Sequence, residues 1–324
     1  MKQSFINTEH IEGRVYEHNL SIKTVQNEKS ANFGKEFISG TLDVATDEEG
    51  LNVLTVHFTY VTEFTKSGGK NQTYAALQKI INEGKTWIAD GKDAATKVKI
   101  DTNLALNDFY AQDDSLVSVK TNEGGFVAIV NELCDLSERN TFTMDMIITA
   151  ANTVEANEDK GITAPYISLR GAVFNFRKDV LPVDFFVKNP VGMKYFEDAE
   201  ISGSNPLFTK VWGKILSATS TVERMEESAF GEAAVKTYER KTKEWVVTGT
   251  AKIPYDFGDE TVLTSDELVA AMQNREVYLA DIKMRSDEYR ANRAASANAA
   301  FSSGNAMNMP TGSAPEAKKG TFNF

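Results

Sequence analysis

The residues that could do acid–base or nucleophilic chemistry are few and scattered. The chain has three histidines and one cysteine: His10, His18, His57 and Cys134. None has HExxH, CxxC or GxSxG spacing, and residues 84–86 (GKT) lack the earlier glycine of a P-loop. Paired acids such as Asp113-Asp114 are typical of turns and solvated surface. The sequence therefore predicts no catalytic residue, metal ligand or cofactor, and indicates a binding protein rather than an enzyme.

The sharpest binding signal is an alternation of aromatic and basic residues. It comprises Phe208, Lys210, Trp212 and Lys214. In a strand these side chains share one face, and the small apolar residues between them suit a core. Aromatic rings can stack on bases while ammonium groups meet phosphates, so this face predicts contact with single-stranded nucleic acid. The alternative, that Trp212 is a buried or edge aromatic with lysines snorkelling around it, stays open.

Two other groups are predicted to add to a nucleic-acid surface. One is a second, weaker alternation, formed by Lys241, Lys243 and Trp245. The other is a window over residues 66–99, where seven lysines stand against three acids in a chain of net charge -11. Its candidate contacts are Lys66, Lys70, Tyr74, Lys92, Lys97 and Lys99. Lysines in mobile loops can track a phosphate backbone, although a solvated helix face with its loops would look the same.

The composition of the chain indicates the domains that position these residues. The chain has 324 residues, of which 41% are hydrophobic, enough for two globular cores. All seven prolines lie at or after Pro165, and the break falls beside the acidic residues 155–161. We therefore expect a first domain over 1–155, a second over 162–262, a helix over 264–295 and a disordered tail over 296–324.

Each half of the sequence is predicted to form several strands, then a helix, and then further strands. The run 51–64 is expected to place Leu54, Val56, Phe58 and Tyr60 on one face. The helix that follows is expected over 74–88, broken or kinked at residue 84. In the second half, strands are expected at 195–201 and 207–216 and a helix over 222–235. A capping box at 264–267 opens the last helix.

This order is that of an OB-fold, a small Greek-key barrel with a helix between its third and fourth strands. Short echoes between residues 11–16 and 169–174, and between 38–40 and 201–203, favour a duplication. The predicted fold is mainly β with some α: two tandem OB-fold-like Greek-key barrels, a C-terminal helix and a disordered tail. Two unrelated β-rich domains are the alternative.

Four segments resemble a known family. Residues 35–46 and 52–58, and also 99–110 and 123–127, resemble OB-fold single-stranded DNA-binding proteins encoded by bacteriophages. The resemblance implies a protein that coats single-stranded DNA without sequence preference during DNA replication or recombination. It also implies replication or recombination proteins as partners of the tail, but this tail ends in Phe324 without the acidic tip of bacterial relatives.

Location and rival functions complete the expectations. With no apolar run long enough for a membrane and one cysteine, the chain is expected in the cytoplasm, the host cytoplasm if phage-encoded. One rival is a phage structural or assembly protein that uses OB-like modules for protein–protein contacts. The other is an enzyme with a divergent site. Salt dependence separates single-stranded DNA binding from the first rival, because binding that coats a DNA strand weakens steeply with salt.

Overall fold

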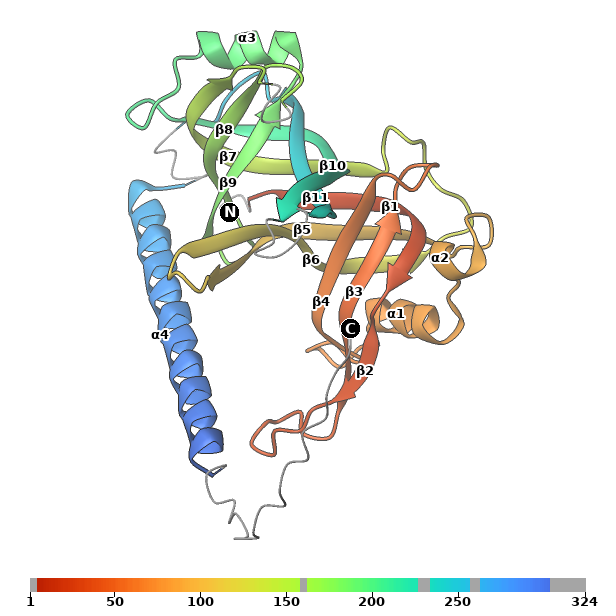
Figure 1. The fold of residues 1–324 in the computed structure, drawn as a ribbon. Coiled ribbons are helices and arrows are strands. Elements are labelled where there is room, and N and C mark those ends of the chain that lie inside the picture. Colours follow the sequence, from red (N-terminus) through yellow and green to blue (C-terminus); the bar gives the residue numbers. More distant parts are fainter. Residues whose placement is uncertain (1–4, 158–161, 227–233, 257–262, 304–324) are drawn as a thin grey trace, which may run out of the picture.

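The strands of this protein form two small barrels with the same order of pairing (Figure 1). The computed structural model describes residues 5–157, 162–226, 234–256 and 263–303. The elements of the first barrel are β1 (Asn7–His18), β2 (Ser21–Thr24), β3 (Glu36–Ala45), β4 (Val53–Thr62), α1 (Gln72–Glu83), α2 (Trp87–Asp90), β5 (Lys97–Tyr110) and β6 (Leu116–Ile129).

The first barrel closes on itself. β1 pairs with β3, β3 with β4, β4 in parallel with β6, β6 with β5, and β5 returns to β1. The helix α1 lies between the third and fourth of these strands, and the short β2 adds to the edge of β3. This is the OB-fold order that the sequence predicts.

The second barrel repeats that order. Its elements are β7 (Asn140–Val154), β8 (Tyr166–Phe174), β9 (Val180–Val187), α3 (Pro190–Asp198), β10 (Leu207–Glu226) and β11 (Ala234–Thr250). β7 pairs with β8 and β10, β8 with β9, β9 in parallel with β11, and β11 with β10. The predicted fold class is therefore confirmed, whereas the division into separate domains at 155–162 stays a prediction.

The short sequence echoes do not mark equivalent positions. Residues 11–16 lie in β1, the first strand of its barrel, whereas 169–174 lie in β8, the second strand of the other. Gly13 of β1 is still needed for barrel closure, because a Cβ there would lie 2.1 Å from the carbonyl oxygen of Ala45.

The helix of the second barrel lies elsewhere than the sequence predicts. The predicted helix 222–235 is wrong: its described residues belong to β10 and β11, which pair as a long hairpin. The predicted strand 195–201 is also wrong in its first part, which belongs to α3. Asn189 caps α3 by accepting from the Val191 N–H, and Pro190 occupies its first turn. This Asn-Pro start signal is local and readable in the sequence.

The two barrels are joined by β1, which belongs to the first barrel and also pairs with β7 of the second. Buried apolar side chains of both barrels form one continuous cluster. Across the junction, the indole N–H of Trp245 donates to Glu9 Oε1 at 2.8 Å. Lys120 Nζ lies 5.0 Å from the Trp245 ring centroid and donates to the Asp184 carbonyl. Trp245 is thereby enclosed by groups from both barrels.

A long helix, α4 (Ser265–Ser303), follows the second barrel, passes the end of β5 and β6, and projects beyond them (Figure 1). The predicted capping box forms, since Thr264 Oγ1 accepts from the Glu267 N–H and Glu267 Oε2 accepts from the Thr264 N–H. Arg275 makes a bidentate pair with buried Asp108 of β5. α4 continues beyond the predicted end at residue 295, and the rest of the predicted tail, 304–324, lies outside the described residues.

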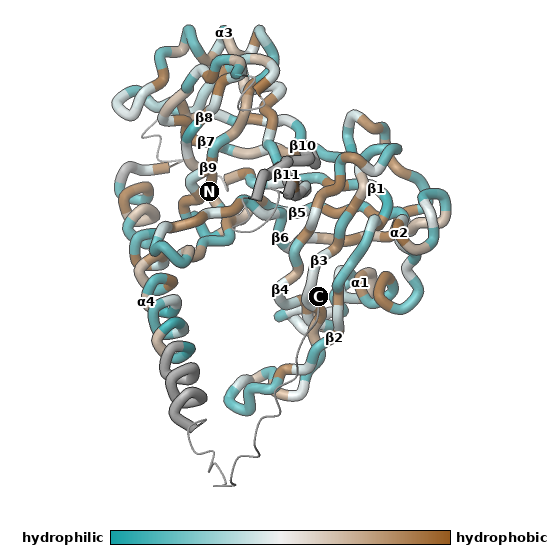
Figure 2. Tube along the Cα trace, viewed as in Figure 1, coloured by the Kyte–Doolittle hydropathy of each residue, from teal (hydrophilic) through white to brown (hydrophobic). Residues whose placement is uncertain are grey.

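Hydrophobic and hydrophilic residues are interspersed along the coloured part of α4 (Figure 2). Among the described helices, none is both long enough and apolar enough to cross a membrane.

Glu9 gives a test of the junction. Burial raises the pKa of Glu9 from 4.5 to about 8, while the Trp245 hydrogen bond and the charge of Lys243 oppose the rise. Between these pH values the unfolded chain loses the proton and the folded chain keeps it, so stability falls as pH rises from about 4.5 to about 8. We expect Glu9→Gln to remove this fall and to raise the free energy of unfolding at pH 7 by up to about 3 kcal/mol.

The measurement is urea unfolding at several pH values, with Glu17→Gln as the control, because Glu17 is an exposed glutamate of the same strand. A Glu9→Gln variant that keeps the pH profile of the wild type would contradict the assignment.

Candidate nucleic-acid interface

The outer face of β10 carries the predicted alternation for three of its four residues. Val211, Gly213 and Ile215 are buried inside the barrel. Between them, Lys210 and Lys214 are partly exposed and the Trp212 side chain is 41% exposed. The sequence period therefore identified the open face of this strand correctly.

The Trp212 ring lies against a glycine. Trp212 pairs with Gly249 of β11, and a Cβ on Gly249 would lie 2.5 Å from Trp212 Nε1 and from Cε2. The ladder shifts register between Trp212 and Gly213, a bulge of the kind that re-aims a side chain. One part of the indole thus contacts backbone, and the remainder is presented to solvent.

Trp212 also lines a depression between the two barrels, which we call the Trp212 groove. It has a volume of about 610 Å³ and receives side chains from β1, β5, β7 and β10. Its polar and aromatic lining includes His10, Glu12, Lys99, Cys134, Trp212 and Lys214. One large aromatic ring and two lysines therefore face the same space, an arrangement that suits a base and its phosphates.

The charge of the groove is mixed, because Glu12 and Glu138 line it together with Lys99 and Lys214. Lys214 Nζ donates to the Ser137 carbonyl and to Asn140 Oδ1, and burial lowers its pKa. Its position is thereby fixed by the segment that precedes β7 and by the first residue of β7. Lys99 stands opposite Glu12 in the β1–β5 ladder.

Phe208 is a correction to the predicted face. It is 1% exposed, because a second apolar cluster covers it. Its ring centroid lies 6.2 Å from that of Phe5 and 4.9 Å from that of Tyr255. Leu263, just before α4, belongs to the same cluster, and Leu268 in the first turn of α4 packs against it. Phe208 therefore cannot stack on a base in this structure.

The second alternation on β11 is also corrected. Trp245 pairs with Ile215 and Lys243 with Ser217, so both lie on the opposite side of the sheet from Lys214. Trp245 is 1% exposed within the junction described above, which excludes it as a stacking surface. The charge of Lys243 opposes the rise that burial causes in the pKa of Glu9, and it adds to burial in lowering the pKa of His57 of the first barrel. The side chain of Lys241 lies outside the described residues.

The residues of the basic window, 66–99, lie in separate parts of the structure. Tyr74 is 3% exposed and belongs to the core, so its predicted contact is wrong. Lys92 Nζ lies 2.9 Å from Glu48 Oε2, and Glu48 also accepts hydrogen bonds from Arg139 and Arg14. These cations hold the pKa of Glu48 at about 2. Lys92 is thus part of a structural ion network.

The other lysines of the window lie in different surroundings. Lys97 Nζ donates to the Asn131 carbonyl at 3.0 Å. Lys66 and Lys70 are exposed in the loop between β4 and α1, and Lys99 lines the Trp212 groove. The structure brings only Lys99 of this window together with Trp212.

The sequence analysis missed a pair of aromatic residues on the first barrel. The rings of Phe37 on β3 and Tyr60 on β4 have centroids 4.6 Å apart, and Tyr60 is 47% exposed. The sequence period predicts Tyr60 on the same face of the strand as Phe58. A register shift between Ile38 and Gly40 of β3 disrupts the alternation, so Phe58 is buried and Tyr60 is not. Such a bulge has no clear sequence signal here beyond Gly40.

Lys23 of β2 lies directly opposite Phe37, which places a cation beside the aromatic pair. We call Lys23, Phe37 and Tyr60 the β3–β4 patch. Phe37 and Tyr60 lie on the second and third strands of the barrel, the face that binds oligonucleotides in OB-folds, and Lys23 lies on the edge strand β2 beside them.

The contact of Trp212 with Gly249 can be tested directly. A methyl group at Gly249 must displace the indole, so we expect Gly249→Ala to move only the Trp212 signal in the 19F NMR spectrum of protein labelled with 5-fluorotryptophan. The free energy of unfolding should change by less than about 1 kcal/mol, because an exposed ring can move aside. Trp87 and Trp245 are internal references, and an unmoved Trp212 signal would refute the contact.

Comparisons with known proteins give one family and distant structural neighbours. A deletion mutant of the single-stranded DNA-binding protein from Thermus aquaticus aligns with a TM-score of 0.45 and 9% identity, over 79% of this chain and 98% of that chain. A replication protein A heterotrimer bound to single-stranded DNA aligns with a TM-score of 0.22 and 9% identity, over 82% and 69%. No curated protein matches. The sequence model of the YorF family matches residues 6–285, and the chain therefore belongs to the YorF family.

Proposed function

We propose that this protein binds single-stranded DNA without sequence preference and coats or protects it during replication or recombination. The observation that carries the proposal is Trp212, a large ring that is 41% exposed between Lys210 and Lys214 on an OB-fold strand. Stacking is tolerant of sequence, because every base has a π-face, and the neighbouring lysines supply charge for phosphates.

The β3–β4 patch supplies a second contact in this proposal. Phe37 and Tyr60 are paired rings on the strands that OB-folds use for oligonucleotides, with Lys23 opposite Phe37. Lys66 and Lys70 follow β4 in an exposed loop. A single DNA strand that binds both this patch and the Trp212 groove would contact both barrels.

Titration of the full chain with oligo-dT, followed by fluorescence anisotropy of a labelled oligonucleotide, tests the stacking role. Loss of one stacked base costs about 1–3 kcal/mol, so Trp212→Ala should weaken binding roughly 5- to 150-fold. Tyr60→Ala should weaken it within the same range. The free energy of unfolding should change by less than about 1 kcal/mol in each variant, since both rings are exposed.

The matched control is Tyr289→Ala, which removes a ring that is 68% exposed on α4. Equal affinity of the wild type and both test variants, or an equal loss in the control, would count against stacking at these positions.

Salt dependence tests the lysines separately. Each lysine that meets a phosphate contributes about 0.7 to the slope of log affinity against log salt for a single strand, so Lys66→Ala and Lys70→Ala should each lower its magnitude by about that amount. Lys92→Ala is the control, because its ammonium group is already paired with Glu48. Slopes that do not differ among the three variants would mean that the loop is only solvated surface.

A protein-contact module is the second candidate, and α4 favours it. Several large apolar side chains of α4 are exposed: Val269, Met272, Val277, Met284 and Tyr289. Under this alternative the chain has no affinity for oligo-dT at any salt concentration. The main proposal, single-stranded DNA binding, also includes three further points. They are recruitment of replication or recombination proteins by residues 296–324, a phage origin and a location in the host cytoplasm.

A further inference from the structure

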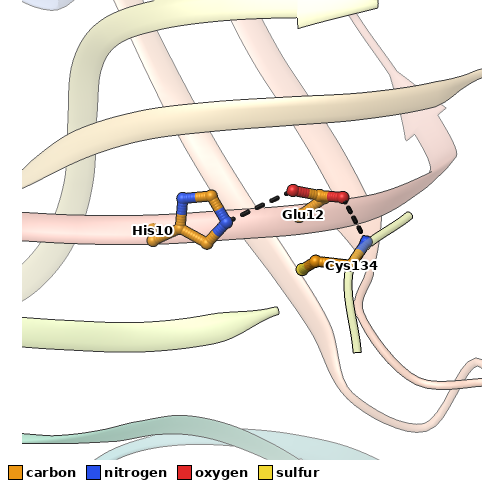
Figure 3. A group of neighbouring side chains, drawn as sticks. All are labelled: His10, Glu12 and Cys134. Carbon is orange, nitrogen blue, oxygen red and sulfur yellow. Dashed lines mark hydrogen bonds and ion pairs between the residues drawn. The ribbon is translucent and has the colours of Figure 1, made fainter. Parts of the chain in front are cut away.

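Three side chains with metal-binding atoms converge at the Trp212 groove: His10 and Glu12 of β1, and Cys134 of the segment before β7 (Figure 3). One ligand atom from each lies within 4.8 Å of the other two. His10 and Glu12 are two positions apart on a strand, which places them on the same face. Cys134 joins them only through the fold, so no short sequence motif announces the cluster.

Each side chain is oriented by a further contact. His10 Nδ1 lies 2.8 Å from Asp101 Oδ1, which leaves Nε2 directed at Glu12. Glu12 Oε1 accepts from the backbone N–H of Cys134 at 2.6 Å, which leaves Oε2 directed at His10. Arg139 Nε holds the Cys134 carbonyl at 2.8 Å. A carboxylate behind the distal nitrogen of a histidine is the usual support of a metal-bound imidazole.

The spacing agrees with a tetrahedral ion. Zinc bonds of about 2.0–2.2 Å to nitrogen and carboxylate oxygen place two such ligands about 3.3–3.4 Å apart. His10 Nε2 and Glu12 Oε2 are 3.3 Å apart. An edge to sulfur is about 3.6 Å, so binding requires at most a modest inward rotation of the Cys134 side chain.

We propose that His10 Nε2, Glu12 Oε2 and Cys134 Sγ form a site for one zinc ion at the junction of the two barrels. Nitrogen, oxygen and thiolate sulfur are the ligand types that zinc accepts. The Glu12 side chain is 6% exposed and that of His10 is 24% exposed, so the ion lies at the wall of the groove. Three protein ligands leave a fourth position for water from the groove.

Without a metal, the same cluster is a set of polar contacts in which the His10 ring lies between Asp101 and Glu12. That arrangement gives no role to the thiol, whose pKa is raised by burial and by Glu12. A coordinating thiol is deprotonated by the ion, and its proton passes to solvent. Participation of Cys134 therefore distinguishes the metal site from these polar contacts.

The experiment adds Zn²⁺ to the full chain after treatment with EDTA, without DNA, and measures stoichiometry and affinity by calorimetry. Co²⁺ is added in parallel as a spectroscopic probe. We expect one ion per chain with a Kd below about 1 µM, and a thiolate-to-cobalt charge-transfer band in the near ultraviolet. Cys134→Ser should remove that band, and Asp101→Asn, which alters only the support of His10, should weaken binding about 10- to 100-fold.

His57→Ala is the matched control, because His57 is a partly buried histidine of the same barrel that lies outside the cluster. Thermal unfolding of each apo variant establishes that it is folded. Absence of one-to-one binding overturns the proposal. So does equal Zn²⁺ affinity of the wild type, His10→Ala and Cys134→Ser. Since no DNA is present, neither result depends on the proposed function.

Discussion

The enclosure of Trp245 between the two barrels is the contact on which the rest of the structure depends. Its indole N–H needs a partner once buried, and Glu9 supplies it from the first barrel. Glu9 lies in the part of β1 that pairs with β5 on one side and with β7 on the other. The position of one barrel against the other is thereby fixed by the β1–β7 backbone ladder and by the hydrogen bond between Trp245 and Glu9.

The Trp212 groove is a consequence of that junction. Its walls come from β1 and β5 of one barrel and from β7 and β10 of the other, so the groove would not exist if either barrel stood alone. Lys120 is held at the same junction, where burial lowers its pKa despite the opposing charge of Asp184. Positioning a cation there is costly unless acceptors are near, and Asp184 and the aromatic rings provide them.

The sequence predicted the OB-fold order because period-two strands and a glycine at a strand bend are local signals. Its predictions of which aromatic side chains are exposed failed where a third element decides the outcome. Trp212 and Phe208 belong to the same alternation, yet Phe5, Tyr255 and the start of α4 cover only Phe208. Trp245 looked like Trp212 in its spacing, but its partner Glu9 is more than two hundred residues away. Periodicity identifies a face, and only tertiary structure says what covers it.

Charge placement explains how a chain of net charge -11 could still meet a polyanion. Acids of the β5–β6 turn are matched by cations of α4, as in the pairs of Asp114 with Lys283 and Arg290. Glu48 is matched by two arginines and Lys92. Charges paired in this way contribute little field at a distance, because salt and the paired partner screen them. A phosphate would encounter the local charges at each surface, and these differ from the net charge of the whole chain.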